Sequence, residues 1–120
     1  MVINSSGKQH RDFIALHNVA RAVYHFLFNL SGKWRDGLFN LGEGRSMSIG
    51  DVAHRIAKVY QRHYGHDIPV EVNKPYQKDP DHPVRFSIEK LIKTGFTCDE
   101  VMDEEILRTL TLCETFRYEK

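Results

Sequence analysis

The sequence predicts an α/β protein with a few short strands and about four helices. Residues 38–41 form a short apolar run between Gly37 and Gly42, which is typical of a buried strand. From Ile49 onwards, apolar residues recur at spacings of three and four, which predicts an amphipathic helix. A buried strand that leads into an amphipathic helix is the basic unit of an α/β fold.

The composition is that of an ordinary soluble domain. The chain has 120 residues, 41% of them hydrophobic and 28% charged, with a net charge of +1. This balance gives no global electrostatic reason to bind nucleic acid or a membrane surface. No apolar run approaches the ~18 residues of a membrane span, and the polar start does not resemble a secretory signal. We therefore expect one cytoplasmic domain with Cys98 and Cys113 as reduced thiols, a disulfide being the less favoured alternative.

The first part of the chain predicts a strand followed by a helix. Residues 13–16 are a short apolar run typical of a strand, and Asn18 is suited to cap the helix after it. Ser31 and Gly32 end that helix. Its apolar stripe consists of Val19, Ala22, Val23, Phe26, Leu27 and Leu30.

The central helix has clear signals at both ends. Ser48 is a good N-cap, and Asp51 can answer its backbone N–H as in a capping box. The helix is expected to run to about Tyr64, with Gly65 as the residue that closes it. Its apolar stripe consists of Ile49, Val52, Ala53, Ile56, Ala57 and Tyr60.

The remaining segments predict one strand, one loop and two helices. Alternation over residues 68–72 indicates a half-exposed strand, and residues 74–83 hold three of the four prolines and read as a surface loop. Ser87 is suited to cap a short helix that closes at Gly95, with Ile88, Leu91 and Ile92 facing inward. A last helix is expected from about residue 103 to 116, with acidic residues in its first turn, where the helix dipole favours them. One face of it holds Ile106, Leu110 and Cys113, and we interpret Cys113 as a core residue rather than a nucleophile.

Three ordered segments resemble a known family. The first reads Gly7-x-Gln9-x-Arg11-Asp12-Phe13-Ile14, followed by Asn18-Val19-Ala20-x-Ala22. The second reads Phe39-Asn40-Leu41-Gly42-x-Gly44, followed by Ile49-x-Asp51-Val52-Ala53. The third reads Val84-Arg85-x-Ser87-x-Glu89-Lys90-Leu91, followed by Thr94-Gly95-Phe96. In this order they resemble the C-terminal part of the extended short-chain dehydrogenase/reductase family. Among its members they most resemble the NAD-dependent nucleotide-sugar epimerases and dehydratases.

The resemblance covers about residues 3 to 116 and implies the substrate-side portion of a Rossmann-type fold. Residues 1–120 would then be a single partial domain without the dinucleotide-binding half. The resemblance implies binding of a nucleoside-diphosphate sugar in cell-surface carbohydrate biosynthesis, by an isomerase or lyase that uses NAD(P). The partner of this chain would be the missing half, or a second copy, because apolar faces made to meet that half would be bare. We accordingly expect a loosely packed or self-associating chain.

The family's catalytic motifs are absent from the sequence. Gly42 and Gly44 follow an apolar run, but Met47 stands where a third fingerprint glycine would be. Tyr60 and Tyr64 lack a lysine four residues on. We therefore assign no catalytic and no cofactor-binding residue, and we expect no NAD(P) binding and no activity from this chain alone. The alternative is a non-catalytic module that binds a nucleotide or a protein and keeps only the family's shape.

Arg11 is the leading candidate for substrate binding. The resemblance implies that this arginine contacts the diphosphate of the nucleotide sugar. A guanidinium group suits that role because it offers a planar fork of donors to phosphate oxygens. The alternative is an exposed arginine in a local ion pair with Asp12, which would be worth little.

Three further candidates lie between residues 78 and 85. Family members often have a Gly-Asp pair here, preceded by an arginine that touches ribose and phosphate, whereas this chain has Lys78 and Asp79. A lysine can still meet a phosphate as a point charge. A solvated turn is an equal alternative. Arg85 matches an arginine common in the family and either serves the ligand or pairs with a nearby carboxylate.

Two other possible binding sites, one for an anion and one for a metal ion, are less well supported by the sequence. The N–H groups of Gly42, Gly44 and Ser46 are placed to meet an anion at the start of a helix, although such a turn is more often only a turn. The seven histidines show no zinc-site spacing with cysteine or carboxylate, so no metal ligand is assigned.

Overall fold

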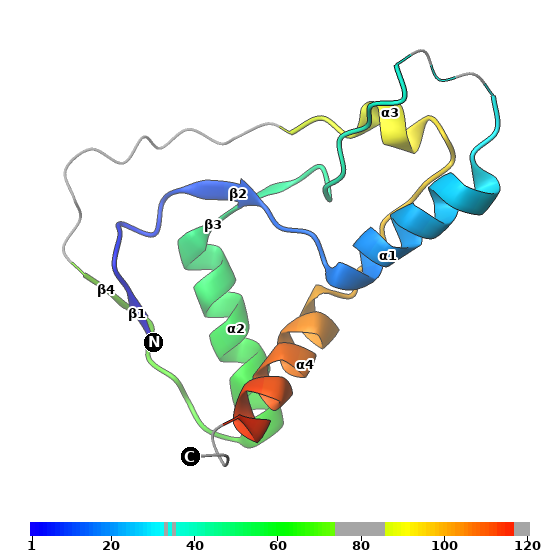
Figure 1. Cartoon of the computed structure of the whole chain (residues 1–120). Helices are drawn as coiled ribbons and strands as arrows, with labels where there is room; N and C mark the ends of the chain where they lie inside the picture. Colours follow the sequence, from blue (N-terminus) through cyan, green and yellow to red (C-terminus); the bar gives the residue numbers. More distant parts are fainter. Residues whose placement is uncertain (33, 35, 74–85, 117–120) are drawn as a thin grey trace.

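The computed structural model describes residues 1–32, 34, 36–73 and 86–116. Within them, four short strands form two pairs. β1 (Val2–Ile3) runs parallel to β4 (Glu71–Val72), and β2 (His10–Asp12) runs antiparallel to β3 (Ser46–Ser48). The described helices are α1 (Leu16–Tyr24), the π-helical turn η1 (His25–Asn29), α2 (Ile49–Tyr64), α3 (Glu89–Ile92) and α4 (Met102–Thr115), arranged as Figure 1 shows. The predicted α/β class is confirmed.

Two predicted strands are wrong. Residues 13–15 are irregular and Leu16 already begins α1, because the strand pairing to β3 ends at Asp12. Residues 38–41 also form no strand, and Leu38 is 72% exposed. A strand needs a neighbour to take its backbone hydrogen bonds, and no other strand lies beside 38–41 in the described part of the chain.

α2 has the ends that its sequence predicts. The Ser48 hydroxyl accepts from the Asp51 N–H at 3.0 Å, and the Asp51 carboxylate accepts from the Ser48 N–H at 3.4 Å, which completes the capping box. At the other end Gly65 has φ 73° and donates its N–H to the Gln61 carbonyl at 2.9 Å. Both devices are local, so they form wherever this sequence is helical.

α1 differs from its prediction in its cap and in its burial. Ala15 is the N-cap, and Asn18 lies one turn inside the helix with its side chain fully buried. Only one side of the apolar stripe is covered. Ala22 is buried, whereas Val23 and Leu27 are 52% and 69% exposed, because no described element packs on their side of the helix.

The core lies between α1 and α3. Its buried members are Ala22, Ile88, Leu91 and Phe96, and the partly buried Phe26, Phe39, Leu41 and Cys98 pack around them. α3 begins at Glu89, so Ile88 rather than Ser87 is its N-cap, although the Ser87 hydroxyl still accepts from the Glu89 N–H at 3.4 Å. Ile92 is 53% exposed and was wrongly expected to face inward, because so short a helix turns only Leu91 fully to the core.

α4 packs on α2 and lies one residue earlier than expected at each end. Ile106 and Leu110 line a groove against Val52 and Ile56 of α2, as a shared face predicts. Cys113 is exposed, so its assignment to the core is wrong. Both described cysteines are free thiols, as expected.

An ionic link joins these two helices. The Asp103 carboxylate of α4 accepts hydrogen bonds from Arg55 and Arg62 of α2, each at 2.5 Å. These bonds, the one from Arg62 foremost, hold the Asp103 pKa below its usual value. A carboxyl with a depressed folded-state pKa stabilises the fold above its unfolded pKa, and the contribution is lost as pH falls through the folded value.

Asp103→Asn is therefore expected to destabilise the chain at pH 7 and to have little further effect at pH 3 or below. The loss at pH 7 should stay within about 1 kcal/mol, because the pair is partly exposed and screened. Urea unfolding of both proteins at the two pH values measures it. An equal difference between the two proteins at both pH values would refute the role given to this carboxylate.

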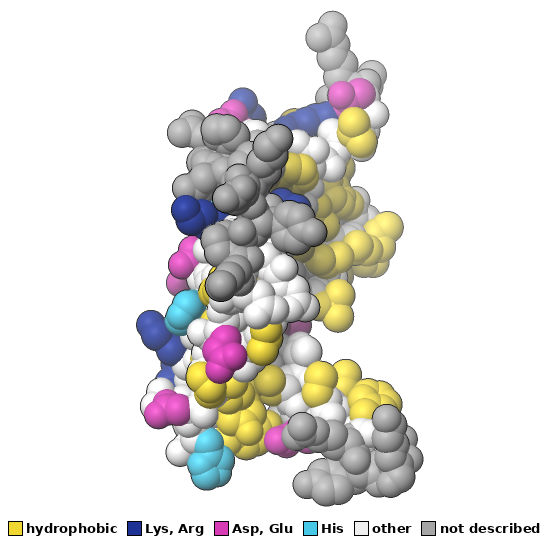
Figure 2. All heavy atoms as spheres, turned by 90° about the vertical axis from the view of Figure 1, so that its left-hand side faces the viewer, with side chains coloured by type: hydrophobic (Ala, Val, Ile, Leu, Met, Phe, Trp, Pro, Cys, Tyr) yellow, Lys and Arg dark blue, Asp and Glu magenta, His cyan; other side chains and the backbone are white. Residues whose placement is uncertain are grey.

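The molecule is extended for its length. Its radius of gyration is 17.6 Å, against about 14 Å for a compact domain of this size. Exposed hydrophobic side chains gather along one edge in Figure 2, and the exposed set includes Leu16, Val23, Leu27, Phe28 and Leu38. This is the exposure expected of a chain that lacks a packing partner, whereas self-association itself stays a prediction. No described helix has the length and apolar character needed to cross a membrane.

Candidate functional site

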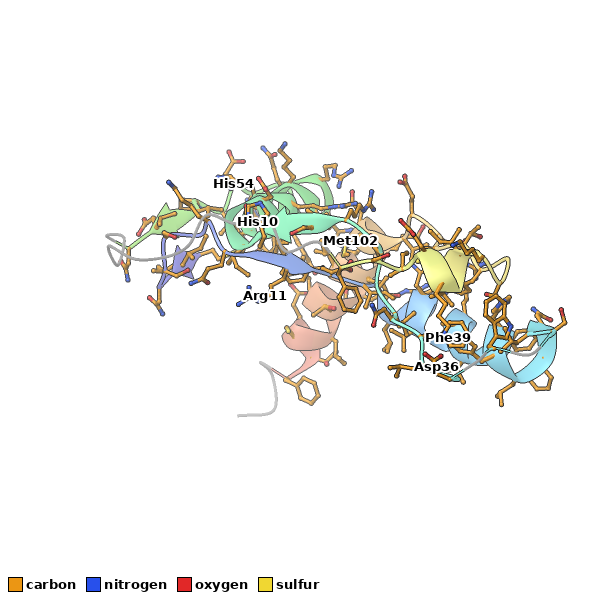
Figure 3. All side chains as sticks on the ribbon, turned by 90° about the horizontal axis from the view of Figure 1, so that it is seen from above. His10, Arg11, Asp36, Phe39, His54 and Met102 are labelled. Atoms are coloured by element: carbon orange, nitrogen blue, oxygen red, sulfur yellow. The ribbon has the colours of Figure 1, made fainter. Side chains whose placement is uncertain are left out.

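Arg11 stands exposed in the middle of β2, opposite Met47 of β3. Because side chains alternate along a strand, Arg11 points away from His10, toward the side of the molecule on which α4 lies (Figure 3). Within the described residues, its guanidinium donates one hydrogen bond, from Nη1 to its neighbour's carbonyl at 2.7 Å, and meets no carboxylate. The alternative of a local ion pair with Asp12 is therefore wrong, and most of the donor fork is available to a ligand.

Asp12 instead binds the turn formed by residues 42–44, which we call the glycine turn. Its Oδ1 accepts from the Glu43 N–H at 2.8 Å, and its Oδ2 accepts from the Gly44 N–H at 2.9 Å. A Cβ on Gly42 would lie 2.9 Å from this carboxylate, so a larger residue there would push Asp12 away from its two N–H partners. The anion bound by the N–H groups of this turn is thus the Asp12 carboxylate of the protein itself. Those two donors are thus already used, which disfavours an external anion there.

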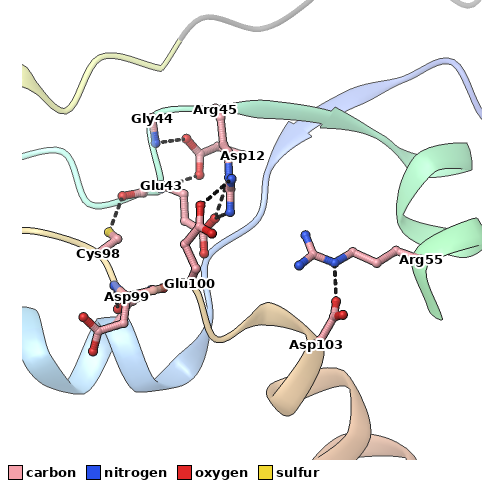
Figure 4. Close-up of polar contacts among 11 residues, drawn as sticks. Asp12, Glu43, Gly44, Arg45, Arg55, Cys98, Asp99, Glu100 and Asp103 are labelled. Atoms are coloured by element: carbon pink, nitrogen blue, oxygen red, sulfur yellow. Dashed lines mark hydrogen bonds and ion pairs between the residues drawn. The ribbon is translucent and has the colours of Figure 1, made fainter. Parts of the chain in front are cut away.

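A polar cluster lies beside this turn (Figure 4). The Glu43 side chain is only 4% exposed and pairs with Arg45 at 3.0 Å, and Arg45 also reaches Glu100 at 3.4 Å. The Cys98 thiol donates to the Gly42 carbonyl at 3.6 Å. Burial, and next the charge of Glu43, raise the pKa of this thiol, so Cys98 is a poor nucleophile at neutral pH.

Asp99, in the segment before α4, is linked to α1 by hydrogen bonds and ion pairs. The amide side chain of Asn18 donates to the Asp99 carbonyl and accepts from the Asp99 N–H, both at 2.9 Å. The Asp99 carboxylate meets His17 at 3.0 Å and Arg21 at 2.7 Å. No local pattern predicts these contacts, because Asp99 lies 81 positions from Asn18 and 82 from His17 along the chain.

Lys78, Asp79 and Arg85 lie outside the described residues, so their predicted roles are neither supported nor opposed. In the described residues, no three His, Cys, Asp or Glu side chains are grouped so as to hold a metal ion. The described site therefore offers one exposed cation, Arg11, on the antiparallel pair of β2 and β3, and a guanidinium group in such a place is suited to an anion.

Comparison with known proteins relates this architecture to epimerases. No family model matches the chain. Over 48 residues, 40% of the chain, the sequence is 46% identical to ADP-L-glycero-D-manno-heptose-6-epimerase from Pseudomonas paraeruginosa (strain DSM 24068 / PA7), of which the match covers 14%. The structure is similar to UDP-N-acetylglucosamine 4-epimerase from Methanobrevibacter ruminantium M1, solved in complex with UDP-N-acetylmuramic acid. The TM-score is 0.63 at 27% identity, over 88% of this chain and 31% of that one.

The chain thus spans less than a third of the length of either relative. One match is in sequence and the other in structure, and both proteins act on sugars carried by a nucleoside diphosphate, as their names state. Sequence motifs, fold and relatives agree in relating this chain to the nucleotide-sugar epimerases of the extended short-chain dehydrogenase/reductase family.

Proposed function

We propose that this chain is the substrate-side part of an NAD(P)-dependent nucleotide-sugar epimerase or dehydratase of cell-surface carbohydrate biosynthesis, and that Arg11 binds the diphosphate of the substrate. The observation that carries the proposal is the exposed Arg11 guanidinium, which meets no carboxylate within the described residues. Its strand is fixed on one side by β3 and, one residue on, by the bonds of Asp12 to the glycine turn. Because the backbone of Arg11 is already paired, only its side chain has to be ordered when a ligand binds.

The exposed apolar side chains support the assignment of this chain to a larger enzyme. Figure 2 shows such side chains along one edge of the molecule. In an intact enzyme, the half that carries the cofactor and the Tyr-x-x-x-Lys pair would cover such residues. Lys78, Asp79 and Arg85 would then be the remaining contacts to phosphate and ribose.

Arg11→Ala is expected to weaken binding of the matching nucleotide sugar at least tenfold, because a charge-assisted hydrogen bond contributes about 1.5–3 kcal/mol. Thermal shift or calorimetry with UDP-, ADP-, GDP-, dTDP- and CDP-sugars measures it, with NAD as the control ligand. Arg11→Lys should fall between the two, since it keeps the charge and loses the fork. Arg108→Ala, which removes an exposed arginine of α4, is the matched control. Equal affinity in Arg11→Ala and the parent chain would refute the role of Arg11.

The purified 120-residue chain should show no hydride transfer, because it contains neither the glycine-rich fingerprint nor the Tyr-x-x-x-Lys pair. The measurement is an incubation with each nucleotide sugar and NAD. It is followed by product analysis and by the absorbance of reduced NAD. Any turnover that survives repurification would contradict the assignment of catalysis to the other half.

The exposed apolar side chains of α1 favour a second candidate, a non-catalytic module whose bare surface binds a protein. The coding sequence upstream of Met1 separates the two. An in-frame glycine-rich fingerprint and Tyr-x-x-x-Lys motif there would establish the enzyme part. A stop codon in that position, together with no binding of any nucleotide sugar, would favour the module.

A further inference from the structure

Met47 is the side chain that flanks Arg11 across the antiparallel pair. The register of β2 and β3 places Arg11 directly opposite Met47, and within the described residues β3 is the only strand beside β2. Residues that face each other in this way share one side of a sheet, with Cβ atoms about 4.5–5.5 Å apart. Met47 therefore lies on the same side as Arg11, whereas Asp12 and its partner Ser46 are turned to the opposite side.

This side of the pair combines a cationic group with an apolar one. Arg11 is exposed, and within the described residues its guanidinium meets only the carbonyl of His10. Met47 is half-buried, so part of its side chain stays accessible. A thioether is apolar and donates no hydrogen bond, so it does not compete with the guanidinium for an anionic oxygen. The two side chains together suit a ligand that has an anionic group with C–H groups next to it.

A sugar ring joined to a phosphate has this combination. A nucleotide sugar carries a ribose at one end of its diphosphate and a second sugar at the other, so both ends present a ring with C–H groups beside the phosphates. A guanidinium holds phosphate oxygens at about 2.7–2.9 Å, and the neighbouring strand is only about 4.8 Å away. A ring that extends from Arg11 toward β3 therefore lies on Met47.

We propose that Met47 completes the binding site at Arg11, its side chain packing on a sugar ring joined to the diphosphate. The inference rests on the proposed function of Arg11 and deepens it, because it names the part of the ligand that lies across the sheet from the diphosphate.

Calorimetric titration of the chain with pyrophosphate, UDP, ADP, UDP-N-acetylglucosamine and ADP-glucose tests the proposal. Met47→Ala is expected to weaken binding of a nucleotide sugar roughly fivefold, because the ring loses its apolar contact. Binding of pyrophosphate, which has no ring, should not change. Equal weakening with UDP or ADP would identify the ribose as the ring on Met47, whereas weakening with the nucleotide sugars alone would identify the second sugar.

Two further variants separate a lost contact from a lost fold. Met47→Leu keeps the apolar volume and should retain most of the affinity. Met47→Thr shortens the side chain and suits a strand, so it decides the question if Met47→Ala does not fold. Unchanged affinity in the shortened variants, an equal loss for pyrophosphate, or an equal loss in Met47→Leu would overturn the role of Met47 alone. A parent chain that binds none of these ligands, or that binds them as well after Arg11→Ala, would overturn the role of Arg11 and this proposal with it.

Discussion

Asp12→Ala is expected to lower the free energy of unfolding by about 2 kcal/mol, because it removes the charged acceptor of two backbone N–H groups, one of them partly buried. The Glu43 N–H and the Gly44 N–H meet separate oxygens of Asp12 at 2.8 and 2.9 Å. These two residues belong to the turn that joins residues 38–41 to β3. A looser turn would therefore also loosen the packing of residues 38–41 and the pairing of β3. Urea unfolding at pH 7 measures the loss, and hydrogen exchange should become faster first at these two amides.

Two matched variants sharpen this test. Asp12→Asn keeps one acceptor and turns an amide N–H toward the other donor, so it should retain part of the stability. Asp67→Ala removes an exposed carboxylate just after α2, and it should change the free energy of unfolding by no more than about 0.5 kcal/mol. Equal costs for Asp12→Ala and Asp67→Ala, with unchanged exchange at Glu43 and Gly44, would show that Asp12 does not hold the turn.

Local signals predicted α2 and α4 well. The capping box of Ser48 and Asp51 and the terminal Gly65 act within a few residues of one another, so the sequence alone contains the complete device. The acidic first turn of α4 is equally local. The bounds of both helices accordingly fall within one residue of expectation.

Features that need a partner were predicted poorly. Residues 38–41 have the apolar run of a strand without a neighbouring strand, and half of the α1 stripe has no covering surface in the described chain. A periodic pattern records which residues are suited to burial, but not whether the surface that buries them is present. The alternative of an ion pair between Arg11 and Asp12 was likewise wrong, because adjacency along the chain says nothing about the glycine turn 31 positions away, to which Asp12 binds.

Asn18 shows how a cap-like residue acquires another role. Asparagine is a frequent N-cap, yet here its fully buried side chain matches the N–H and the carbonyl of Asp99, each at 2.9 Å. One donor and one acceptor on Asp99 call for a side chain with one of each, which asparagine has and an ionised aspartate lacks.

Asn18→Ala is expected to cost about 3 kcal/mol, because both backbone groups of Asp99 lose their partner inside the protein. Asn18→Asp should cost at least as much at pH 7, where a buried carboxylate oxygen would face the Asp99 carbonyl oxygen. Burial raises the pKa of such a carboxyl, and the protonated form can donate to the carbonyl. A carboxyl whose pKa is higher in the folded than in the unfolded state destabilises the fold while it is ionised, and this cost is removed as pH falls through the folded-state pKa. Asn18→Asp should therefore regain stability relative to Asn18→Ala as pH falls from 7 toward 5. Urea unfolding of both variants at these two pH values measures the difference, and a constant gap between them would show that the Asp99 backbone does not select asparagine.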